Sequence, residues 1–357
     1  MVPYIDMHCD TLGVLRKMRK GGADVSWEEA GLAVDVPGME KGRCLCQNLA
    51  MFVNLYAADG FMEDGEDAKP CDPFLPVQEM KALFDGLLTE NAERIMQVRN
   101  AAEIERAAAL GKAGVMLTVE EGGVCGGEIS RLDDLHAMGV RMLTLTWNYE
   151  NELGHPNSSP YAVSGVTNTS LGVQHSYKGA MRHEPGLIRP LGLKKTGFAF
   201  VEHMREIGMI ADVSHLSDDG FFDVADCLKG PFVASHSNTR SLCPCPRNLT
   251  DAMIRRLAEC GGAAGLAFFP GFVDPGENPK QTTALLAAHA RHLIDVGGIG
   301  CVALGSDFDG CSGEMEIDSA GKMQLLAEGL ASNGLTADEI EHVFYKNALR
   351  VYRDVLG

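Results

Sequence analysis

The chain places histidine and carboxylate side chains at the ends of apolar runs, where such groups could hold a metal ion. The run at 4–8 leads into His8 and Asp10. Residues at alternate positions of a strand share one face, so Asp6, His8 and Asp10 are expected on the same side. Charged groups on a buried strand cost free energy unless they are paired or bind a cation. This spacing alone permits a metal site or a capped turn at a strand end.

Similar groups follow four further apolar runs: Glu120 and Glu121 in "VEEGG", His215 in "DVSH", His236 in "ASHS", and Asp307 and Asp309 in "GSDFDG". Imidazoles and carboxylates are ligands of zinc and similar divalent ions. These groups are too many for one four-coordinate zinc that keeps a position open for water. Two ions that share one carboxylate would use them, so we expect a two-metal site.

The elements that position these groups follow a regular alternation. Strands are predicted at 4–8, 46–53, 114–120, 141–147, 209–215, 232–237, 263–269 and 301–307, and helices at 75–98, 130–138, 198–207, 218–228, 250–259, 281–296 and 319–333. Apolar strands separated by helices indicate a parallel sheet that is covered on both faces. Eight such units favour a single (β/α)8 TIM-type barrel domain over 1–357, with the polar groups on its carboxyl-end rim.

Two segments interrupt this alternation. Residues 148–196 follow the fourth strand and are rich in Gly, Pro, Asn and Ser. A loop of this length in a compact domain is usually functional or disordered, and we expect it to cover the barrel mouth. Residues 54–74 are acidic and turn-rich, and they are predicted to form a solvated loop.

The composition and net charge of the chain disfavour some classes of binding partner. The 357 residues carry a formal net charge of -18, which disfavours nucleic acid and anionic membrane surfaces as partners. No apolar run is long enough to span a bilayer, and the start of the chain does not resemble a secretory leader. The eleven cysteines are therefore expected to stay reduced, in the cytoplasm.

The ordered set "DMHCDT", "VEEGG", "MLTLTW", "IADVSHLS", "ASHSNTRSLCPCPRN" and "GSDFDG" resembles the membrane (renal) dipeptidase family of binuclear zinc peptidases. The resemblance implies an amidohydrolase-type barrel with two Zn²⁺ ions, and it also suggests a homodimer. It places one zinc on His8 and Asp10, the other on His215 and His236, and a bridging catalytic carboxylate on Glu121, directly before Gly-Gly. It also makes Arg247 in "PRN" the partner of the substrate carboxylate and Asp307 the acid/base.

This reading predicts hydrolysis of dipeptides by a metal-bridging hydroxide, and it leaves open whether a C-terminal D-residue is accepted. The alternative is another binuclear metal amidohydrolase, acting on a cyclic amide, a lactam or an N-acyl amino acid. His-x-Asp on the first strand and a glutamate bridge favour the dipeptidase. A third reading is a barrel that binds metal or ligand without turnover. Trp147 stands where family members commonly carry a histidine, which leaves the substrate preference open.

Overall fold

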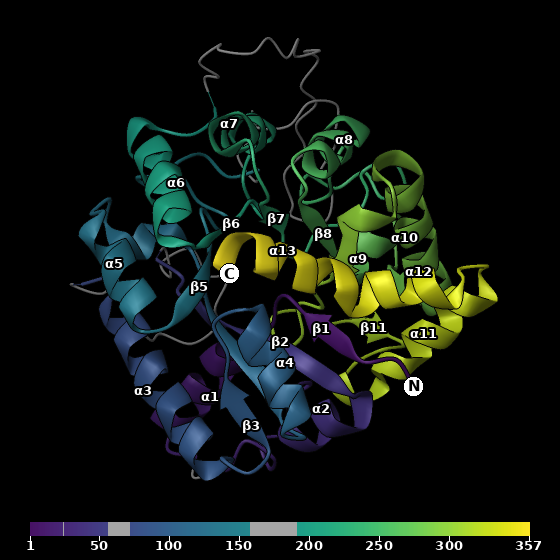
Figure 1. Cartoon of the computed structure of the whole chain (residues 1–357), viewed down its shortest axis with the longest axis horizontal. Helices are drawn as coiled ribbons and strands as arrows, with labels where there is room; N and C mark the ends of the chain where they lie inside the picture. The colour runs from purple at the N-terminus through teal and green to yellow at the C-terminus, as the bar shows by residue number, and fades with distance from the viewer. Residues whose placement is uncertain (24, 56–71, 158–190) are drawn as a thin grey trace.

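The computed structural model describes residues 1–23, 25–55, 72–157 and 191–357. Parallel strands close into a barrel in the order β2-β1-β10-β8-β7-β6-β5-β4, and β4 pairs back with β2 (Figure 1). The barrel strands are β1 (Tyr4–Asp6), β2 (Cys44–Phe52), β4 (Ala113–Glu120), β5 (Val140–Thr144), β6 (Ile210–Asp212), β7 (Val233–Ala234), β8 (Ala263–Leu266) and β10 (Val302–Leu304). The predicted (β/α)8 barrel is confirmed.

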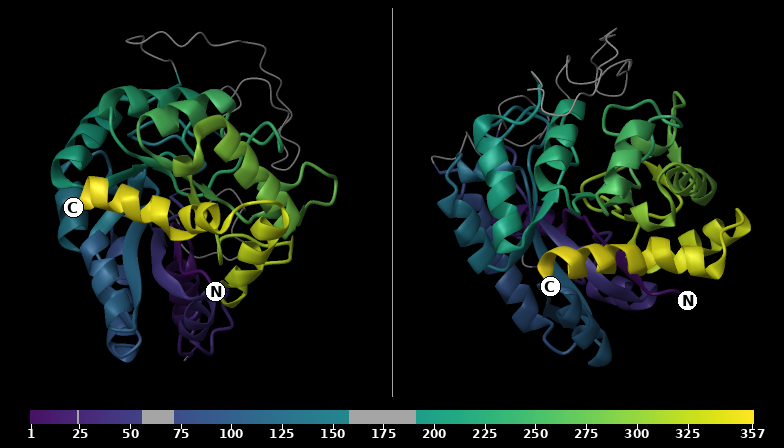
Figure 2. Two further views of the ribbon diagram at one scale, coloured as in Figure 1. Left: turned by 45° about the vertical axis from the view of Figure 1, so that its right-hand side comes forward. Right: turned by 45° about the horizontal axis from the view of Figure 1, so that its top comes forward.

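Helices surround the barrel, and Figure 2 shows them following one another around it in chain order. They are α1 (Thr11–Lys20), α2 (Val36–Gly42), α3 (Leu75–Glu90), α4 (Ala101–Ala109), α5 (Ser130–Ala137), α6 (Lys195–Ile207), α7 (Asp218–Leu228), α8 (Asp251–Glu259), α9 (Pro270–Val273), α10 (Thr283–Gly297), α11 (Met323–Ser332), α12 (Ala337–Glu341) and α13 (Asn347–Leu356). The strands are buried on both faces, as their apolar sequences predict.

The helix predicted at 75–98 is too long. Helix α3 ends at Glu90, and Asn91 donates its side-chain amide to the Leu87 carbonyl there. The chain then forms a short strand, β3 (Ile95–Gln97), which pairs with the first three residues of β4. A strand of three residues is too short for its periodicity to be distinguished from the end of a helix, so the sequence does not reveal it. A second small sheet joins β9 (Lys280–Gln281) to β11 (Glu314–Met315).

One end of the barrel is closed by α13, which crosses it in Figure 1. Ala348, Val351 and Tyr352 of α13 pack in one apolar cluster with side chains such as Ile210 and Val233, the first residues of β6 and β7. Helix α13 therefore covers the amino ends of the strands. The carboxyl ends, at the opposite side, are left for the polar groups.

The remaining predictions concern the two long loops, the domain organisation, membrane spans and the cysteines. Most of the predicted loops at 54–74 and 148–196 lies outside the described residues, so their placement stays a prediction, as does the single-domain organisation of 1–357. No helix in the described part of the chain is long and apolar enough to cross a membrane. The ten cysteines within the described ranges are free thiols.

Candidate metal centre

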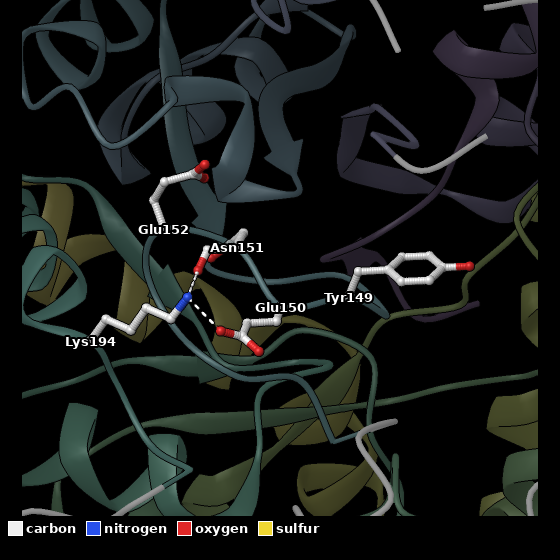
Figure 3. Close-up of a pocket in the computed structure, with 5 residues that line it drawn as sticks. All are labelled: Tyr149, Glu150, Asn151, Glu152 and Lys194. Atoms are coloured by element: carbon white, nitrogen blue, oxygen red, sulfur yellow. Dashed lines mark hydrogen bonds and ion pairs between the residues drawn. The ribbon is translucent and has the colours of Figure 1, made fainter. Parts of the chain in front are cut away.

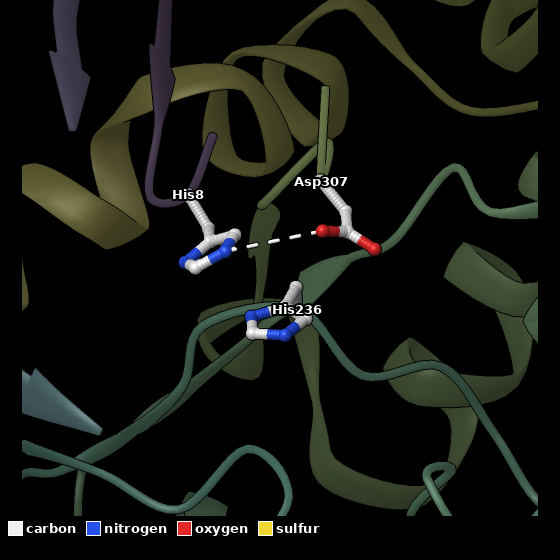
Figure 4. Close-up of side chains that lie close together, drawn as sticks. All are labelled: His8, His236 and Asp307. Carbon is white, nitrogen blue, oxygen red and sulfur yellow. Dashed lines mark ion pairs between the residues drawn. The ribbon is translucent and has the colours of Figure 1, made fainter. Parts of the chain in front are cut away.

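Six side chains converge at the carboxyl ends of the barrel strands. Three groups bring ligand atoms within 4.8 Å of one another: His8, Asp10 and Glu120; Glu120, His215 and His236; and His8, His236 and Asp307. The first five of these side chains are buried, and 14% of the Asp307 side chain is exposed. Figure 4 shows the stacked rings of His8 and His236, with centroids 4.0 Å apart, and the Asp307 carboxylate facing them.

Glu120 lies between the two clusters of ligands. Its Oε1 is 3.0 Å from Nε2 of His215 and 3.7 Å from Nε2 of His236. Its Oε2 is 3.4 Å from Nε2 of His8, which in turn is 3.4 Å from Oδ2 of Asp10. Each carboxylate oxygen thus faces a different set of ligands, which is the arrangement of a bridging carboxylate.

Glu121, the predicted bridge, points elsewhere, and this assignment is corrected. Its Oε1 accepts hydrogen bonds from Gly123 N (2.7 Å) and Asn151 Nδ2 (2.5 Å), and its Oε2 accepts one from Trp147 N (2.9 Å). Glu120 is the last residue of β4, and adjacent residues of a strand face opposite sides. Glu121, with a φ of 93°, leaves the strand and caps the short 3₁₀ helix at Gly122–Cys125.

The tautomer of His236 follows from its neighbours. Asp212 accepts hydrogen bonds on Oδ2 from the hydroxyls of Thr144 (2.7 Å) and Ser235 (2.6 Å). The single hydroxyl hydrogen of Ser235 is therefore committed to Asp212, and its oxygen accepts from Nδ1–H of His236 at 2.8 Å. The Nε2 lone pair of His236 is left free and faces the cluster.

His215 is oriented in the same way by a different residue. Its Nδ1 donates to Oδ1 of Asn148 at 2.9 Å, which leaves a lone pair on Nε2. The Nε2 atoms of His215 and His236 lie 3.0 Å apart, and both face Oε1 of Glu120. Lone pairs directed at one another repel unless a cation lies among them, so the donor set fits a metal ion.

The electrostatics of the two histidines agree with this fit. Burial lowers the pKa of His215 to about 4, and the positive charge of Arg247 adds to this shift. Burial also holds the pKa of His236 well below its usual value, with further contributions from His8 and Arg247. Both imidazoles are therefore neutral near pH 7, which is the form that ligates metals.

The other half of the cluster concentrates negative charge. Burial lowers the pKa of His8, but the charges of Glu120 and Asp10 outweigh it and raise that pKa well above the usual value. Burial and the charge of Glu120 raise the pKa of Asp10 to about 6. Nε2 of His8 and Oδ1 of Asp10 are buried without a hydrogen-bond partner among the described residues. These groups attract a cation and leave atoms free to bind it.

Asp307 is a member of the cluster, and Arg247 lies directly beside it. Arg247 is 3% exposed, and it donates to the His236 carbonyl at 3.3 Å and the Ser237 hydroxyl at 3.4 Å. Its guanidinium lies over the ring of Phe272, 5.1 Å from the centroid. Within the described ranges it forms no ion pair, and its Nε has no partner. Oδ1 of Asp307 lies 3.9 Å from Nε2 of His8.

Two other acidic candidates have structural roles. Asp6 accepts hydrogen bonds from the amide (2.8 Å) and hydroxyl (2.6 Å) of Ser306, which joins β1 to the end of β10. Asp309 accepts hydrogen bonds from the Thr11 hydroxyl (2.6 Å) and the Ala33 amide (2.8 Å). Through these hydrogen bonds, both carboxylates stabilise the backbone around the ligands.

The fold and the site define a barrel hydrolase of the metal-dependent type, and comparison with known proteins gives the family. The profile of the membrane dipeptidase family (peptidase family M19) matches residues 1–356. The chain belongs to this family and is a peptide hydrolase of the metallo-dipeptidase class, as the motifs predict.

Related proteins and solved structures show how far the similarity extends along the chain. An uncharacterized protein in the pqqA 5′ region of Klebsiella pneumoniae is 30% identical over 288 residues, 80% of this chain and 98% of that protein. The dipeptidase ataJ of Aspergillus terreus is 27% identical over 75% of this chain and 64% of its own length. A metallopeptidase from Rhodobacter sphaeroides, solved with a phosphinate mimic of L-Ala-D-Ala, has a TM-score of 0.83 at 23% identity, with 99% of each chain covered. This structural likeness shows the shared fold.

Proposed function

We propose that the protein hydrolyses dipeptides with a free C-terminal carboxylate to amino acids, with two zinc ions bound at the candidate metal centre. The substrate class is inferred from the surroundings of the Arg247 side chain. It is a buried guanidinium beside the ligands, with no carboxylate partner in the described part of the chain. Buried charges are normally paired, so a substrate carboxylate is the anion that fits.

Two ligand groups support two ions. His8, Asp10 and Glu120 would hold one, and Glu120, His215 and His236 the other, so that Glu120 takes the bridging role. Imidazole and carboxylate ligands suit zinc. Bound divalent ions would polarise the scissile carbonyl and lower the pKa of the attacking water.

The remaining residues bind substrate and move a proton. Arg247 would hold the terminal carboxylate at a fixed distance from the ligands, which restricts the substrate to very short peptides. Asp307, the most exposed member of the cluster, would take the proton from the attacking water on its carboxylate and pass it to the leaving amine.

The carboxylate requirement is tested by comparing free and C-terminally amidated dipeptides, in the wild type and in Arg247→Ala. Charge-assisted hydrogen bonds are worth about 1.5–3 kcal/mol each, so kcat/KM for free dipeptides should fall roughly ten- to a few hundredfold per bond lost. Amidated dipeptides should be poor substrates for both proteins. Equal cleavage of free and amidated dipeptides by the wild type would contradict the proposal.

The metal requirement is tested on the same preparation. We expect near two zinc equivalents per chain, loss of activity on chelation, and recovery on addition of zinc. Dipeptide hydrolysis by metal-free protein would contradict this mechanism. A lactam and an N-acetyl amino acid belong in the substrate panel, because faster cleavage of either would favour the alternative amidohydrolase.

Three finer points are part of the proposal. Dipeptides with a C-terminal D-residue belong in the panel, because the Rhodobacter sphaeroides structure holds a mimic of L-Ala-D-Ala. A homodimer and a cytoplasmic location stay predictions. Sedimentation of the purified protein and fractionation of the cells that produce it would test them.

A further inference from the structure

Three aromatic side chains lie together beside the metal centre. Phe52 ends β2, and Trp147 and Tyr149 follow β5. The ring centroid of Trp147 is 4.8 Å from that of Phe52 and 5.8 Å from that of Tyr149. It is also 6.2 Å from the ring of His215. All three aromatic side chains are only partly buried. We call this group the aromatic surface.

Hydrogen bonds to the buried carboxylate of Glu121 hold the backbone that carries the aromatic surface. The Trp147 amide donates to Oε2 of Glu121, and the Asn151 side chain donates to its Oε1. Oδ1 of Asn151 in turn accepts from the amides of Leu153 (2.8 Å) and Gly154 (3.2 Å). A buried carboxylate with several amide donors is a rigid anchor, so the Trp147 backbone is held in place before any ligand arrives.

A second tether holds the next part of the same loop. Lys194 pairs with Glu150 at 2.7 Å and donates to the Asn151 carbonyl at 2.6 Å. Figure 3 shows the Tyr149 ring extending away from this Lys194–Glu150 pair. The charged side of the loop is therefore separate from its aromatic side.

The strand order places Phe52 across the barrel from Arg247. In the closed ring of barrel strands, β2, which ends at Phe52, lies opposite β7, and His236 and Arg247 follow β7. Trp147 follows β5, which is separated from β7 by β6 alone, and its ring centroid is 6.2 Å from that of His215, which follows β6. The metal ligands lie between Phe52 and Arg247. A dipeptide with its carboxylate at Arg247 and its peptide carbonyl at the ligands would extend its N-terminal residue toward the aromatic surface.

We infer that the aromatic surface binds the side chain of the N-terminal residue of the dipeptide and selects large apolar side chains. This inference rests on the proposed dipeptidase function. Aromatic rings that stay partly exposed beside a site gain stability when an apolar group covers them. A discrimination of about ten- to a few hundredfold between large and small side chains is typical of such pockets.

The test measures kcat/KM for Leu-Ala, Phe-Ala and Gly-Ala in the wild type and in Trp147→Ala. The wild type should prefer Leu-Ala and Phe-Ala to Gly-Ala by about tenfold or more, and Trp147→Ala should lose most of that preference. Trp147→Phe should retain part of it. Glu152→Gln changes an exposed residue of the same loop, so it is the matched control and should leave the ratio unchanged.

A second series fixes the orientation of the substrate. Ala-Leu and Ala-Gly vary only the C-terminal residue, so their ratio should change little in Trp147→Ala. Binding of phosphinate analogues of Leu-Ala and Gly-Ala, measured by calorimetry, provides a readout that does not depend on turnover. Far-ultraviolet circular dichroism and metal content show whether Trp147→Ala is folded and loaded. If it is not, Tyr149→Ala is measured in its place.

The outcomes separate this inference from the proposed function. Absence of dipeptide hydrolysis in the wild type would overturn the proposed function and this inference with it. Hydrolysis without a preference for large N-terminal residues would overturn only this inference. A parallel fall of all substrates in Trp147→Ala would show a structural role instead. A change confined to the Ala-Leu and Ala-Gly ratio would reverse the orientation.

Discussion

The neighbouring carboxylates of Glu120 and Glu121 face opposite sides of the chain. Oε1 of Glu120 lies 3.0 Å from Nε2 of His215, whereas both oxygens of Glu121 accept hydrogen bonds from N–H groups of the loops around it. One glutamate belongs to the metal centre and the other to its support. Their substitutions are therefore expected to have different effects.

Glu120→Gln should remove the negative charge that both metal groups share, and it should replace one of the two ligand oxygens with an NH₂ group that cannot bind a metal. Metal content should fall below one equivalent per chain, and dipeptide hydrolysis should fall by at least a hundredfold. Glu121→Gln should keep the metals but lower the melting temperature, because its amide nitrogen would face N–H donors and cost about 1–3 kcal/mol. Elemental analysis and thermal unfolding of both variants check this. Metal loss in Glu121→Gln alone would restore the bridge to Glu121.

Ser235→Ala should weaken metal binding without removing a ligand. The substitution deletes the acceptor of Nδ1–H of His236, so the imidazole loses the partner that fixes its tautomer. We expect about 10–100-fold weaker metal affinity in competition with a chelator. Ser241→Ala is the control, because that hydroxyl contacts Asp251 near the surface. Equal affinities of the two variants would show that Ser235 does not orient His236.

Asp307→Asn separates proton transfer from metal binding. If Asp307 moves the proton, kcat should fall by about 10²–10⁴-fold while two metal equivalents remain bound. The measurement pairs steady-state kinetics with elemental analysis. Loss of one metal equivalent would instead make Asp307 a ligand, as its grouping with His8 and His236 also permits. An unchanged kcat would exclude both roles.

The stability of the fold should depend on pH through His289, far from the metal ligands in sequence. His289 is 1% exposed, its Nδ1 accepts the amide of Thr239 at 3.2 Å, and its Nε2 donates to the Val273 carbonyl at 2.9 Å. Burial lowers its pKa, outweighing the opposing effect of the bond to Val273. The unfolded chain therefore binds a proton that the folded chain resists, so stability is full above about pH 6.5 and falls as the pH drops below it.

The measurement for His289 compares thermal unfolding of the wild type and His289→Gln between pH 7.5 and pH 5.5. Glutamine can accept and donate at the same two positions but does not titrate. One proton contributes at most about 1.4 kcal/mol per pH unit, so the wild type should lose more stability on acidification than the variant. Metal release from the other histidines affects both proteins alike. Parallel pH profiles would show that His289 does not contribute.

The barrel and most of the metal centre could be predicted from the sequence because both depend on local patterns. A short apolar run indicates a strand, and a His or Asp at its end indicates a side chain at the carboxyl-end rim of the barrel. His215 and His236 are examples. The choice between Glu120 and Glu121 could not be made in this way. Every residue of β4 is buried, so its sequence does not show which face is which. The structure shows Met116 in the inner apolar cluster, and Glu120 shares its face.

The residues that orient His215 and His236 could not be predicted from the sequence, for a different reason. Asn148 and Ser235 contact the histidines through side chains whose partners are distant in the chain or specified only by geometry. A signal was present in Asp212, Ser214 and Ser235, since polar residues within otherwise apolar strands need buried partners. Their partners could not be named without the strand register.

The join between β1 and β10 has a consequence for how the protein is made. Asp6 and Ser306 are 300 residues apart in the chain, yet their hydrogen bonds close the ring of strands next to His8 and Asp307. Contacts between such distant segments form late and slow folding. During synthesis, His8 and Asp10 leave the ribosome long before the strand that completes their surroundings. Asp307 therefore joins the other five side chains of the candidate metal centre only in the last steps of barrel closure, after the segments that carry both ligand groups have been made.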